Sequence, residues 1–473
     1  MDYSYRAFLY QKFLAISELF DNPIELRDWL LTFLFYFFLS ASVEDLILTD
    51  KGVVYQNLSD QEAEEKYKDL ILTKKGYFLL PSELFSKVSK SEDQDLDVYL
   101  GKIFENIESS TITTGWSKHF SGLLTTLDLS ADLITKEQRF KKIKACLEFI
   151  QEVSPAPIGS YDIQKSLSES FNVLLKFFHP KSKDLVGQYI TPKKIVDLLV
   201  GLVFDKNKQK QIVSICDPVC GGGTLLLAVK EKYPKSIVYG QDSNSQISRL
   251  ARMNCIINGL SKWEFTILTD DLITSDNFFL NGLYDIIVAE PTIYTNLDEI
   301  DLIFADQKRF LQLNVADFGK RLDAFTVLFA MQTLASGGIA AIFVYPGLLH
   351  KDGACFELRK LLIEQNMVDA VISLPDNVLF HTRLNPQVLV LKKNRLDKQV
   401  LFIDASREYS PVKDLETNKK SILDNLTNEG VAKIHSVYHN RENQPFFSQL
   451  VNLDLIKKNN YSLSVANYVS RLA

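Results

Sequence analysis

The sequence predicts an α/β fold in which an open, doubly wound sheet follows an all-helical region. Between about 186 and 393, short apolar runs alternate with segments of helical period, as in a parallel sheet with crossover helices. Before about 179, apolar residues recur at helical spacing with few strand signals. A chain of 473 residues suits two or three domains, and 46% apolar residues are enough for their cores.

The sheet region is organised around the stretch 212–227. An apolar run at 212–216 ends at Asp217, and three glycines, 221–223, precede a second apolar segment. This order predicts a strand, a loop and a helix. Glycines lack Cβ atoms, so backbone N–H groups can approach a ligand at the helix N-terminus. No Lys-Ser or Lys-Thr follows the glycines and the spacing is not GxGxxG, so a charged ligand other than a nucleoside triphosphate is favoured.

Acidic residues follow the next three predicted strands. Strand 236–240 leads to Asp242, strand 265–268 to Asp270, and strand 284–289 to Glu290. In open α/β sheets the carboxyl ends of the strands form the edge where ligands bind, and an acid after the second strand can accept both hydroxyls of a ribose. The sequence therefore predicts a ligand site at this edge.

The remaining elements complete the prediction. Further strands are expected at 339–344, at 368–374 and 387–392 as an antiparallel pair, and at 400–403; helices are expected at 322–334, 353–365 and 427–439. A Pro-Lys-Ser-Lys loop at 180 suggests the first domain junction. The predicted domains are therefore 1–180 (helical), 181–400 (sheet) and 401–473 (C-terminal segment).

Composition narrows the functional classes. The net charge of −6 and the pI near 5.7 argue against a protein that grips a DNA backbone unaided. Five scattered cysteines suit a reducing cytoplasm, and Cys216 and Cys220 have no histidine or second cysteine pair nearby, so no metal site is expected. The apolar run Trp29–Ala41 is too short to span a bilayer, which needs about 20 residues, so it predicts a buried helix and no membrane association.

The order of motifs resembles the adenine-N6 DNA methyltransferases, and more specifically the modification subunit of type I restriction-modification systems. The matching segments are 187–192 (Gly-Gln-Tyr-Ile-Thr-Pro), 217–223 (Asp-Pro-Val-Cys-Gly-Gly-Gly), 250–254 (Leu-Ala-Arg-Met-Asn), 270–272 (Asp-Asp-Leu), 338–349, 370–392 and 401–406. The resemblance covers nearly the whole chain. It implies a Rossmann-like fold of the S-adenosylmethionine-dependent methyltransferases, with S-adenosylmethionine as cofactor and an all-helical N-terminal domain.

The resemblance also implies which residues touch this cofactor. The implied cofactor-binding residues are Tyr189, Thr191, Asp217, Cys220, Gly221, Gly223, Asp242 and Asp270. The alternative is that the glycines and acids only serve the folding of the turns. A glycine triplet together with acids at three strand ends exceeds what folding requires, so cofactor binding is favoured.

The catalytic motif departs from that of the resembling family. Methylation of an adenine amine requires a flipped base whose two amine hydrogens are held by acceptors. The family uses Asn-Pro-Pro-Phe/Tyr, in which side-chain and backbone carbonyl oxygens accept these hydrogens and the ring stacks on the base. Here the segment is Glu290, Pro291, Thr292 and Ile293, followed by Tyr294.

Each departure has a physical consequence. An unpaired carboxylate at Glu290 is expensive to desolvate in a closed pocket. Thr292 frees a φ angle that a proline would hold near about −65°. Ile293 offers no aromatic face, a stacking contact worth roughly 1–3 kcal/mol, although a local bulge could bring Tyr294 over the base. These changes predict impaired catalysis.

Three functions remain open at this point. The first is an active adenine-N6 DNA methyltransferase that binds DNA and works with a specificity subunit, and in a whole system with a restriction subunit, as part of a hetero-oligomer. The second is an inactive pseudo-methyltransferase that acts as a cofactor-binding or assembly component. The third is a methyltransferase for RNA or protein. By resemblance, the helical domain helps clamp DNA, the loop 295–321 reaches toward DNA, and the C-terminal segment contributes to assembly.

Overall fold

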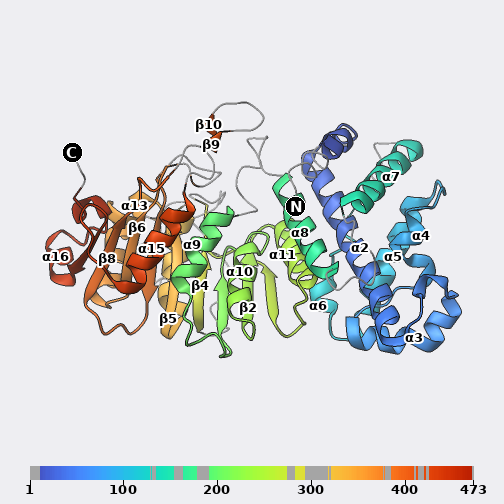
Figure 1. Ribbon diagram of the computed structural model, residues 1–473, viewed down its shortest axis with the longest axis horizontal. Helices are drawn as coiled ribbons and strands as arrows, with labels where there is room; N and C mark the ends of the chain where they lie inside the picture. Colours follow the sequence, from blue (N-terminus) through green and yellow to red (C-terminus); the bar gives the residue numbers. More distant parts are fainter. Residues whose placement is uncertain are drawn as a thin grey trace. The chain divides into compact units, whose positions relative to one another are not determined.

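The computed structural model divides the chain into two compact units, which are described separately. It describes residues 11–127, 129, 135–153, 163–177, 191–273, 283–292, 318, 321–376, 378, 385–409, 412–413, 420–421 and 426–470. Unit 1 comprises Met1–Lys181 and Arg249–Trp263, and unit 2 comprises Ser182–Ser248 and Glu264–Ala473. Figure 1 shows the helices of unit 1 and the sheet of unit 2 with its covering helices.

Unit 1 is built from helices packed around α2 (Pro23–Lys51). Asn22 caps the start of α2, since its side chain accepts a hydrogen bond from the N–H of Ile24, and Gly52 ends the helix at φ 66°. The helices around α2 are α3 (Asp60–Lys75), α4 (Phe85–Val88), α5 (Leu96–Ser110), α6 (Ser117–Phe120), α7 (Lys136–Val153) and α8 (Ile163–Phe177).

The helix α2 is longer than the apolar run at 29–41 indicated. It has 29 residues, and its apolar part is long enough by length and composition to cross a bilayer. However, 83% of that apolar part is buried inside the structure. Aromatic residues such as Phe33, Phe35 and Tyr36 are fully buried. The predicted buried helix is thus confirmed, and its length is corrected.

Unit 1 also includes residues 249–263, which the predicted helical domain did not contain. The helix α11 (Ser245–Ile257) begins in unit 2 and continues in unit 1. Within unit 1, the guanidinium of Arg249 donates to the carbonyl of Leu123 at 3.2 Å. That of Arg252 donates to the carbonyl of Ser121 at 2.8 Å. Buried arginines bonded to backbone carbonyls explain why this stretch belongs to the helical unit.

Unit 2 is built around one nine-stranded sheet. Its strands are β1 (Ser214–Asp217), β2 (Ile237–Asp242), β3 (Phe265–Thr269), β4 (Tyr284–Ala289), β5 (Leu334–Val344), β6 (Val368–Ser373), β7 (Gln387–Lys392), β8 (Gln399–Asp404) and β11 (Ser448–Asn452). Their order in the sheet is β11-β8-β6-β7-β5-β4-β1-β2-β3. The strands from β5 to β3 in this order are parallel, whereas β7 runs antiparallel to β5 and β6, and β11 antiparallel to β8. A separate pair of two-residue strands, β9 (Val412–Lys413) and β10 (Lys420–Ser421), is antiparallel.

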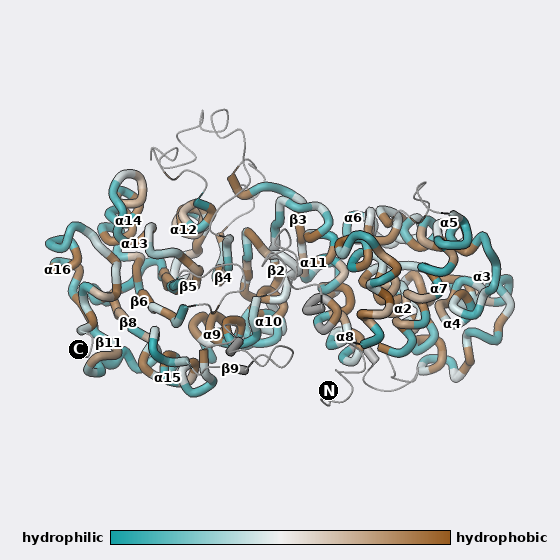
Figure 2. The backbone as a smooth tube through the Cα atoms, turned by 90° about the horizontal axis from the view of Figure 1, so that it is seen from above, coloured by the Kyte–Doolittle hydropathy of each residue, from teal (hydrophilic) through white to brown (hydrophobic). Residues whose placement is uncertain are grey.

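Helices cover both faces of the sheet, as Figure 2 shows. One face carries α9 (Lys193–Val203), α10 (Thr224–Lys232) and α15 (Asn428–Asn440), and the other carries α12 (Leu322–Thr333), α13 (Pro346–His350) and α14 (Ala354–Glu364). The short helix α16 (Leu453–Lys458) follows β11. This arrangement is the doubly wound layering that alternating strands and helices predict.

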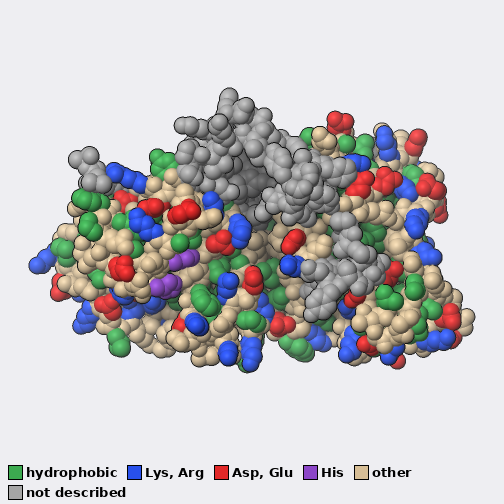
Figure 3. Space-filling view, viewed as in Figure 1, with side chains coloured by type: hydrophobic (Ala, Val, Ile, Leu, Met, Phe, Trp, Pro, Cys, Tyr) green, Lys and Arg blue, Asp and Glu red, His purple; other side chains and the backbone are tan. Residues whose placement is uncertain are grey.

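Two histidines fasten α15 to the end of α9. The Nε2 atoms of His435 and His439 lie 3.0 Å from the carbonyl oxygens of Leu198 and Gly201, respectively, and donate to them. A Cβ at Gly201 would lie 2.1 Å from the His435 ring, so glycine is needed for this close approach. Figure 3 shows histidine side chains on the visible face, over the position of α15.

Most predicted strands lie where the sequence placed them, with three differences. β1 starts two residues later than the predicted run, and β5 starts at Leu334 rather than 339 because the turn expected at 335–338 is already extended. The predicted antiparallel pair is confirmed by the pairing of β6 with β7. The expected boundary between 400 and 401 falls inside β8, so residues on both sides of it share one sheet.

Candidate functional site

Five neighbouring strands deliver polar residues to one edge of the sheet. The strands β5, β4, β1, β2 and β3 lie side by side in this order and run in the same direction. Their carboxyl ends lead into Tyr345, Glu290, Asp217, Asp242 and Asp270. The four acids that the sequence singled out therefore lie along the same edge.

The glycine loop after β1 is built to keep its backbone close to β2. Gly221 and Gly223 have φ angles of 53° and 78°, a region that L side chains rarely adopt. The N–H of Cys220 donates to the carbonyl of Gln241 at 2.8 Å, and the N–H of Gly221 donates to the carboxylate of Asp242 at 3.2 Å. Gly223 then begins α10 as its N-cap. The loop is thus fixed by backbone contacts that need glycine at two of its positions.

Close packing explains both Gly240 and the buried Cys220. A Cβ at Gly240 would lie 2.9 Å from the Cys220 sulfur and 2.8 Å from Leu226. Cys220 is buried, and its sulfur faces this strand. The contacts that the structure gives Cys220 are therefore packing contacts, and its predicted role in cofactor binding stays a prediction.

The acids at this edge share a strongly acidic environment. Asp217 is only 2% exposed and accepts from the N–H of Val219 at 3.0 Å. Burial raises its pKa well above the usual range, and the carboxyl groups of Asp242 and Glu290 add to this increase. Burial likewise raises the pKa of Asp242 to about 6, against the hydrogen bonds from the N–H groups of Asn244 and Gly221. Such a site favours a ligand that carries positive charge.

Asp270 is tied into the same edge through the backbone. Its N–H donates to the carbonyl of Asp242 at 3.1 Å, and its carboxylate accepts from the N–H of Asp271 at 3.0 Å. Asp271 in turn accepts from the N–H of Ile273 at 2.8 Å. These local turns hold Asp270 beside Asp242.

The segment after β4 has two side-chain contacts of its own. The side chain of Thr191 hydrogen-bonds the carboxyl group of Glu290. The hydroxyl of Tyr345 donates to the carbonyl of Pro291 at 3.3 Å. Burial raises the pKa of Glu290 to about 8, so this group is largely uncharged at neutral pH. The cost of an ionised carboxylate in this place is thereby avoided.

Sequence reasoning assigned Thr191 to the cofactor and missed Tyr345. The structure brings Thr191 to Glu290 instead, and no described contact of Thr191 with a cofactor residue is found. Tyr345 could have been found from the sequence, because it follows the predicted strand at 339–344, whose carboxyl end reaches the same edge. Tyr189, Ile293, Tyr294 and the loop 295–317 lie outside the described residues.

Two polar side chains at this edge fit a polar ligand. Both the nitrogen and the oxygen of the Gln241 amide are buried without a hydrogen-bond partner in the described part of the chain, and so is the hydroxyl of Thr224. Gln241 precedes Asp242 on β2, and Thr224 opens α10 after the glycine loop. Buried polar groups are normally paired, so unpaired ones beside a glycine loop are consistent with a cofactor that brings its own polar atoms.

Comparison with known proteins decides the family. The family model of the N-6 DNA methylases matches residues 163–473. A relative from Mycoplasma pneumoniae, the type I restriction enzyme MpnII methylase subunit, is 30% identical over 94% of this chain and 86% of its own length. The chain belongs to the N-6 DNA methylases, among the methylase subunits of type I restriction enzymes.

Solved structures agree with this N-6 DNA methylase fold. The type I restriction-modification methyltransferase subunit from Streptococcus thermophilus has a TM-score of 0.81 at 24% identity, covering 98% of this chain and 100% of that one. A second structure, described under "complex assembly and conformational transition of the type I R-M system", has a TM-score of 0.67 at 16% identity and covers 98% and 90%. The predicted family, fold class and methyltransferase cofactor, S-adenosylmethionine, are confirmed. The roles of individual residues in this methylase stay predictions.

The raised pKa of Glu290 has a measurable effect on stability. The folded carboxyl keeps its proton up to about pH 8, whereas the ordinary value is 4.5. Between these values the unfolded state binds fewer protons, so the free energy of unfolding falls as pH rises through this window. Glu290→Gln is expected to remove this dependence and to raise the free energy of unfolding at pH 8 by about 1–3 kcal/mol.

Urea denaturation of wild type and Glu290→Gln at pH 5 and pH 8 measures this effect. The gain should be small at the lower pH, where both folded and unfolded carboxyl groups approach the protonated state. An equal difference at the two pH values would contradict the assignment of the raised pKa to Glu290.

Proposed function

We propose that this chain is the DNA adenine-N6 methyltransferase (modification) subunit of a type I restriction-modification system. It binds S-adenosylmethionine and DNA and acts with a specificity subunit. One observation carries the proposal: Glu290 and Pro291 follow β4 directly beside Asp217 of the glycine loop, close enough that the Glu290 charge affects the pKa of Asp217. The acceptors for an adenine amine therefore adjoin the place expected for the methyl donor.

The residues present fit the cofactor. Asp242 offers a carboxylate for the ribose hydroxyls, and the acids Asp217 and Asp270 suit the positively charged part of the molecule. Gly221 and Gly223 let the backbone approach it. When bound, S-adenosylmethionine supplies a methyl group on a positively charged sulfur.

The chain's own residues hold the adenine amine. An uncharged Glu290 can accept one amine hydrogen through its carbonyl oxygen, much as an asparagine amide does, and Thr191 orients this carboxyl group. The carbonyl of Pro291 can accept the other hydrogen, because a carbonyl oxygen has two lone pairs and Tyr345 uses one. Holding both hydrogens turns the nitrogen lone pair toward the donor methyl.

The altered motif favours a second candidate function. Glu290, Thr292 and Ile293 stand where the family motif has Asn, Pro and an aromatic residue. On this account the chain is a pseudo-methyltransferase that serves as a cofactor-binding or assembly component. A methyltransferase for RNA or protein is the remaining alternative.

Methyl transfer to DNA by the reconstituted complex separates these functions. Tritiated S-adenosylmethionine is incubated with DNA, the chain and its specificity subunit, while calorimetry measures cofactor binding to the chain. Transfer by the wild-type complex supports the proposal. No transfer with cofactor binding intact rejects it, and activity gained by Glu290→Asn, Thr292→Pro and Ile293→Phe together would then support the pseudo-methyltransferase. Label found only in RNA or protein from an extract would support the third function.

The proposed partners follow from the family and the charge. The net charge of −6 suits a chain that shares its DNA contacts with a specificity subunit. A similar protein was solved in work titled for complex assembly of the type I system, which supports a hetero-oligomer here that also includes a restriction subunit. All five cysteines are free and buried, consistent with the cytoplasm.

The two raised pKa values predict a bell-shaped pH profile. Asp242, with a pKa of about 6, must be ionised to accept both ribose hydroxyls, so cofactor binding weakens as pH falls below 6. Glu290, with a pKa of about 8, is uncharged below that value. Methyl transfer by the complex should therefore be fastest between these values. Glu290→Gln, which stays neutral, should lose only the decline at high pH, and an unchanged decline would contradict this role of Glu290.

A further inference from the structure

The hydroxyl of Tyr345 is placed to fix one backbone carbonyl. Tyr345 follows β5 and is buried, and its hydroxyl lies 3.3 Å from the carbonyl oxygen of Pro291, which follows the neighbouring strand β4. The next residue is Thr292, whose φ angle is not restrained as that of a proline would be. This hydrogen bond therefore restrains the carbonyl at the point where the sequence has lost a rigid residue.

The position of Tyr345 is itself set by a buried ion pair. Its N–H donates to the Asp323 carboxylate at 3.0 Å. Arg321 holds Asp323 with two hydrogen bonds, from Nε at 3.1 Å and from Nη2 at 2.7 Å. The same Nη2 donates to the carbonyl of Tyr345 at 3.3 Å. Arg321 thus grips both Asp323 and the backbone of Tyr345.

The surroundings show that this pair occupies a space shaped for it. Asp323 is fully buried, and the Arg321 side chain is 13% exposed. A Cβ at Gly347 would lie 2.1 Å from Nη1 of Arg321, so glycine leaves the room that the guanidinium needs. Two-point Arg–carboxylate pairs are geometrically specific, which suits a positioning role.

The tyrosine hydroxyl stays a donor at every pH used for activity. Burial raises the pKa of Tyr345 above its usual value, and the carboxyl groups of Glu290 and Asp323 add to this increase while Arg321 opposes it. A protonated hydroxyl donates, and the Pro291 carbonyl only accepts. The direction of this hydrogen bond is therefore fixed.

We propose that Tyr345, held by Asp323 and Arg321, is a positioning residue that fixes the Pro291 carbonyl and compensates for Thr292 in place of proline. The consequence for catalysis rests on the proposed function, in which this carbonyl accepts an adenine amine hydrogen. The restraint on the backbone does not depend on that function. The two can therefore be tested apart.

Hydrogen–deuterium exchange in the full chain tests the restraint. Tyr345→Phe removes one hydroxyl and should raise the exchange rate in peptides covering 288–292 by about fivefold, as expected for one lost hydrogen bond. Tyr233→Phe is the matched control, because the Tyr233 hydroxyl also donates to a buried carbonyl, that of Val203 at 3.0 Å. Exchange unchanged by Tyr345→Phe, or raised equally by Tyr233→Phe, would overturn the proposal.

Kinetics of the reconstituted complex test the consequence. Tyr345→Phe should lower kcat about fivefold with the KM for S-adenosylmethionine unchanged, and Thr292→Pro added to it should recover much of the loss. An equal loss in cofactor affinity, or no recovery, would overturn the positioning role. If the wild-type complex transfers no methyl group while Tyr345→Phe raises exchange, the proposed function fails and the restraint stands.

Discussion

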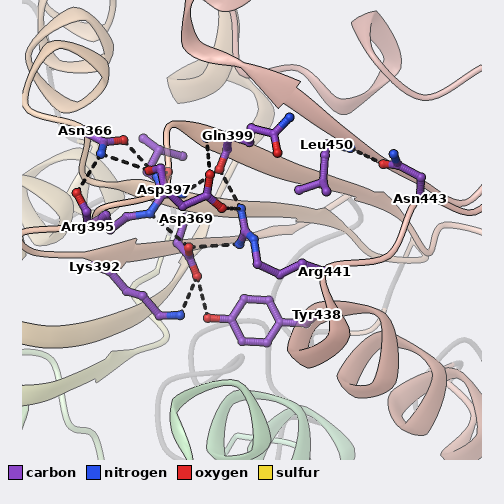
Figure 4. Close-up of polar contacts among 11 residues, drawn as sticks. Asn366, Asp369, Lys392, Arg395, Asp397, Gln399, Tyr438, Arg441, Asn443 and Leu450 are labelled. Carbon is purple, nitrogen blue, oxygen red and sulfur yellow. Dashed lines mark hydrogen bonds and ion pairs between the residues drawn. The ribbon is translucent and has the colours of Figure 1, made fainter.

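Asp369→Ala is expected to lower the free energy of unfolding of unit 2 by about 3–5 kcal/mol, because it leaves a buried arginine without its carboxylate. Asp369 is 4% exposed and lies between three cations, as Figure 4 shows. Its carboxylate contacts Lys392 at 2.9 Å, and Arg395 and Arg441 at 3.1 Å each. Arg395 is itself 4% exposed, so water does not replace the lost partner.

The Asp369 cluster joins several elements of unit 2, which is why its loss should be large. Asp369 lies on β6, Lys392 ends β7, and Tyr438 of α15 donates its hydroxyl to Asp369 at 2.7 Å. Arg395 also donates to the carbonyls of Val368 and Gln399, so it links β6 to β8. Removing the carboxylate leaves these donors close together with like charges unopposed.

A neighbouring aspartate provides the control for Asp369. Asp397 contacts Arg441 at 2.9 Å but is 43% exposed, so Asp397→Ala should cost less than about 1 kcal/mol. Urea denaturation followed by circular dichroism measures both variants. Similar losses for Asp369→Ala and Asp397→Ala would contradict the claim that burial decides the effect.

The effect of Asp369→Ala should also depend on pH in a defined direction. Burial alone would raise the pKa of Asp369, but Lys392 and Arg395 together with its hydrogen bonds hold it below the ordinary value. A carboxyl group with a lowered folded pKa stabilises the fold above its unfolded pKa of about 3.9, and this contribution is lost as pH falls through the folded pKa. The difference between wild type and Asp369→Ala should therefore shrink only below about pH 4.

The parts of the fold that are local in sequence could be predicted, and the long-range parts could not. Three glycines after an apolar run predicted the loop and the start of α10, since φ angles of 53° and 78° at Gly221 and Gly223 need glycine. In contrast, Arg249 and Arg252 gave no sign that 249–263 belongs with the N-terminal helices. Their partners are backbone carbonyls more than a hundred residues away.

The same distinction applies to the candidate site. Asp242 and Glu290 could be found because each directly follows an apolar strand, and the edge of an open sheet brings such positions together. The uncharged state of Glu290 could not be found, because it depends on burial and on Thr191. Tyr345 was missed because its role depends on the pairing of β5 with β4 and on Asp323, which accepts from its backbone.

Asp242→Ala is expected to weaken S-adenosylmethionine binding about 100-fold. Its carboxylate is the acceptor proposed for two ribose hydroxyls, and an unmet hydrogen bond to a charged group costs roughly 1.5–3 kcal/mol. The same carboxylate also accepts from the N–H of Gly221 at 3.2 Å and from the N–H of Asn244 at 2.9 Å. Alanine therefore removes a ligand contact and releases the glycine loop together.

Two further variants separate these contributions. Asp242→Asn keeps an oxygen that can accept from Gly221 but loses the charge, so its affinity should fall only about tenfold. Asp205→Ala is the matched control, because Asp205 also accepts from the N–H two residues ahead, that of Asn207 at 2.9 Å, but lies before β1 at the other end of the strand. Calorimetry on the full chain measures all three affinities. Wild-type affinity in Asp242→Ala would show that the acid after β2 holds only the loop, whereas an ordered loss from Asn to Ala with Asp205→Ala unchanged would assign it both roles.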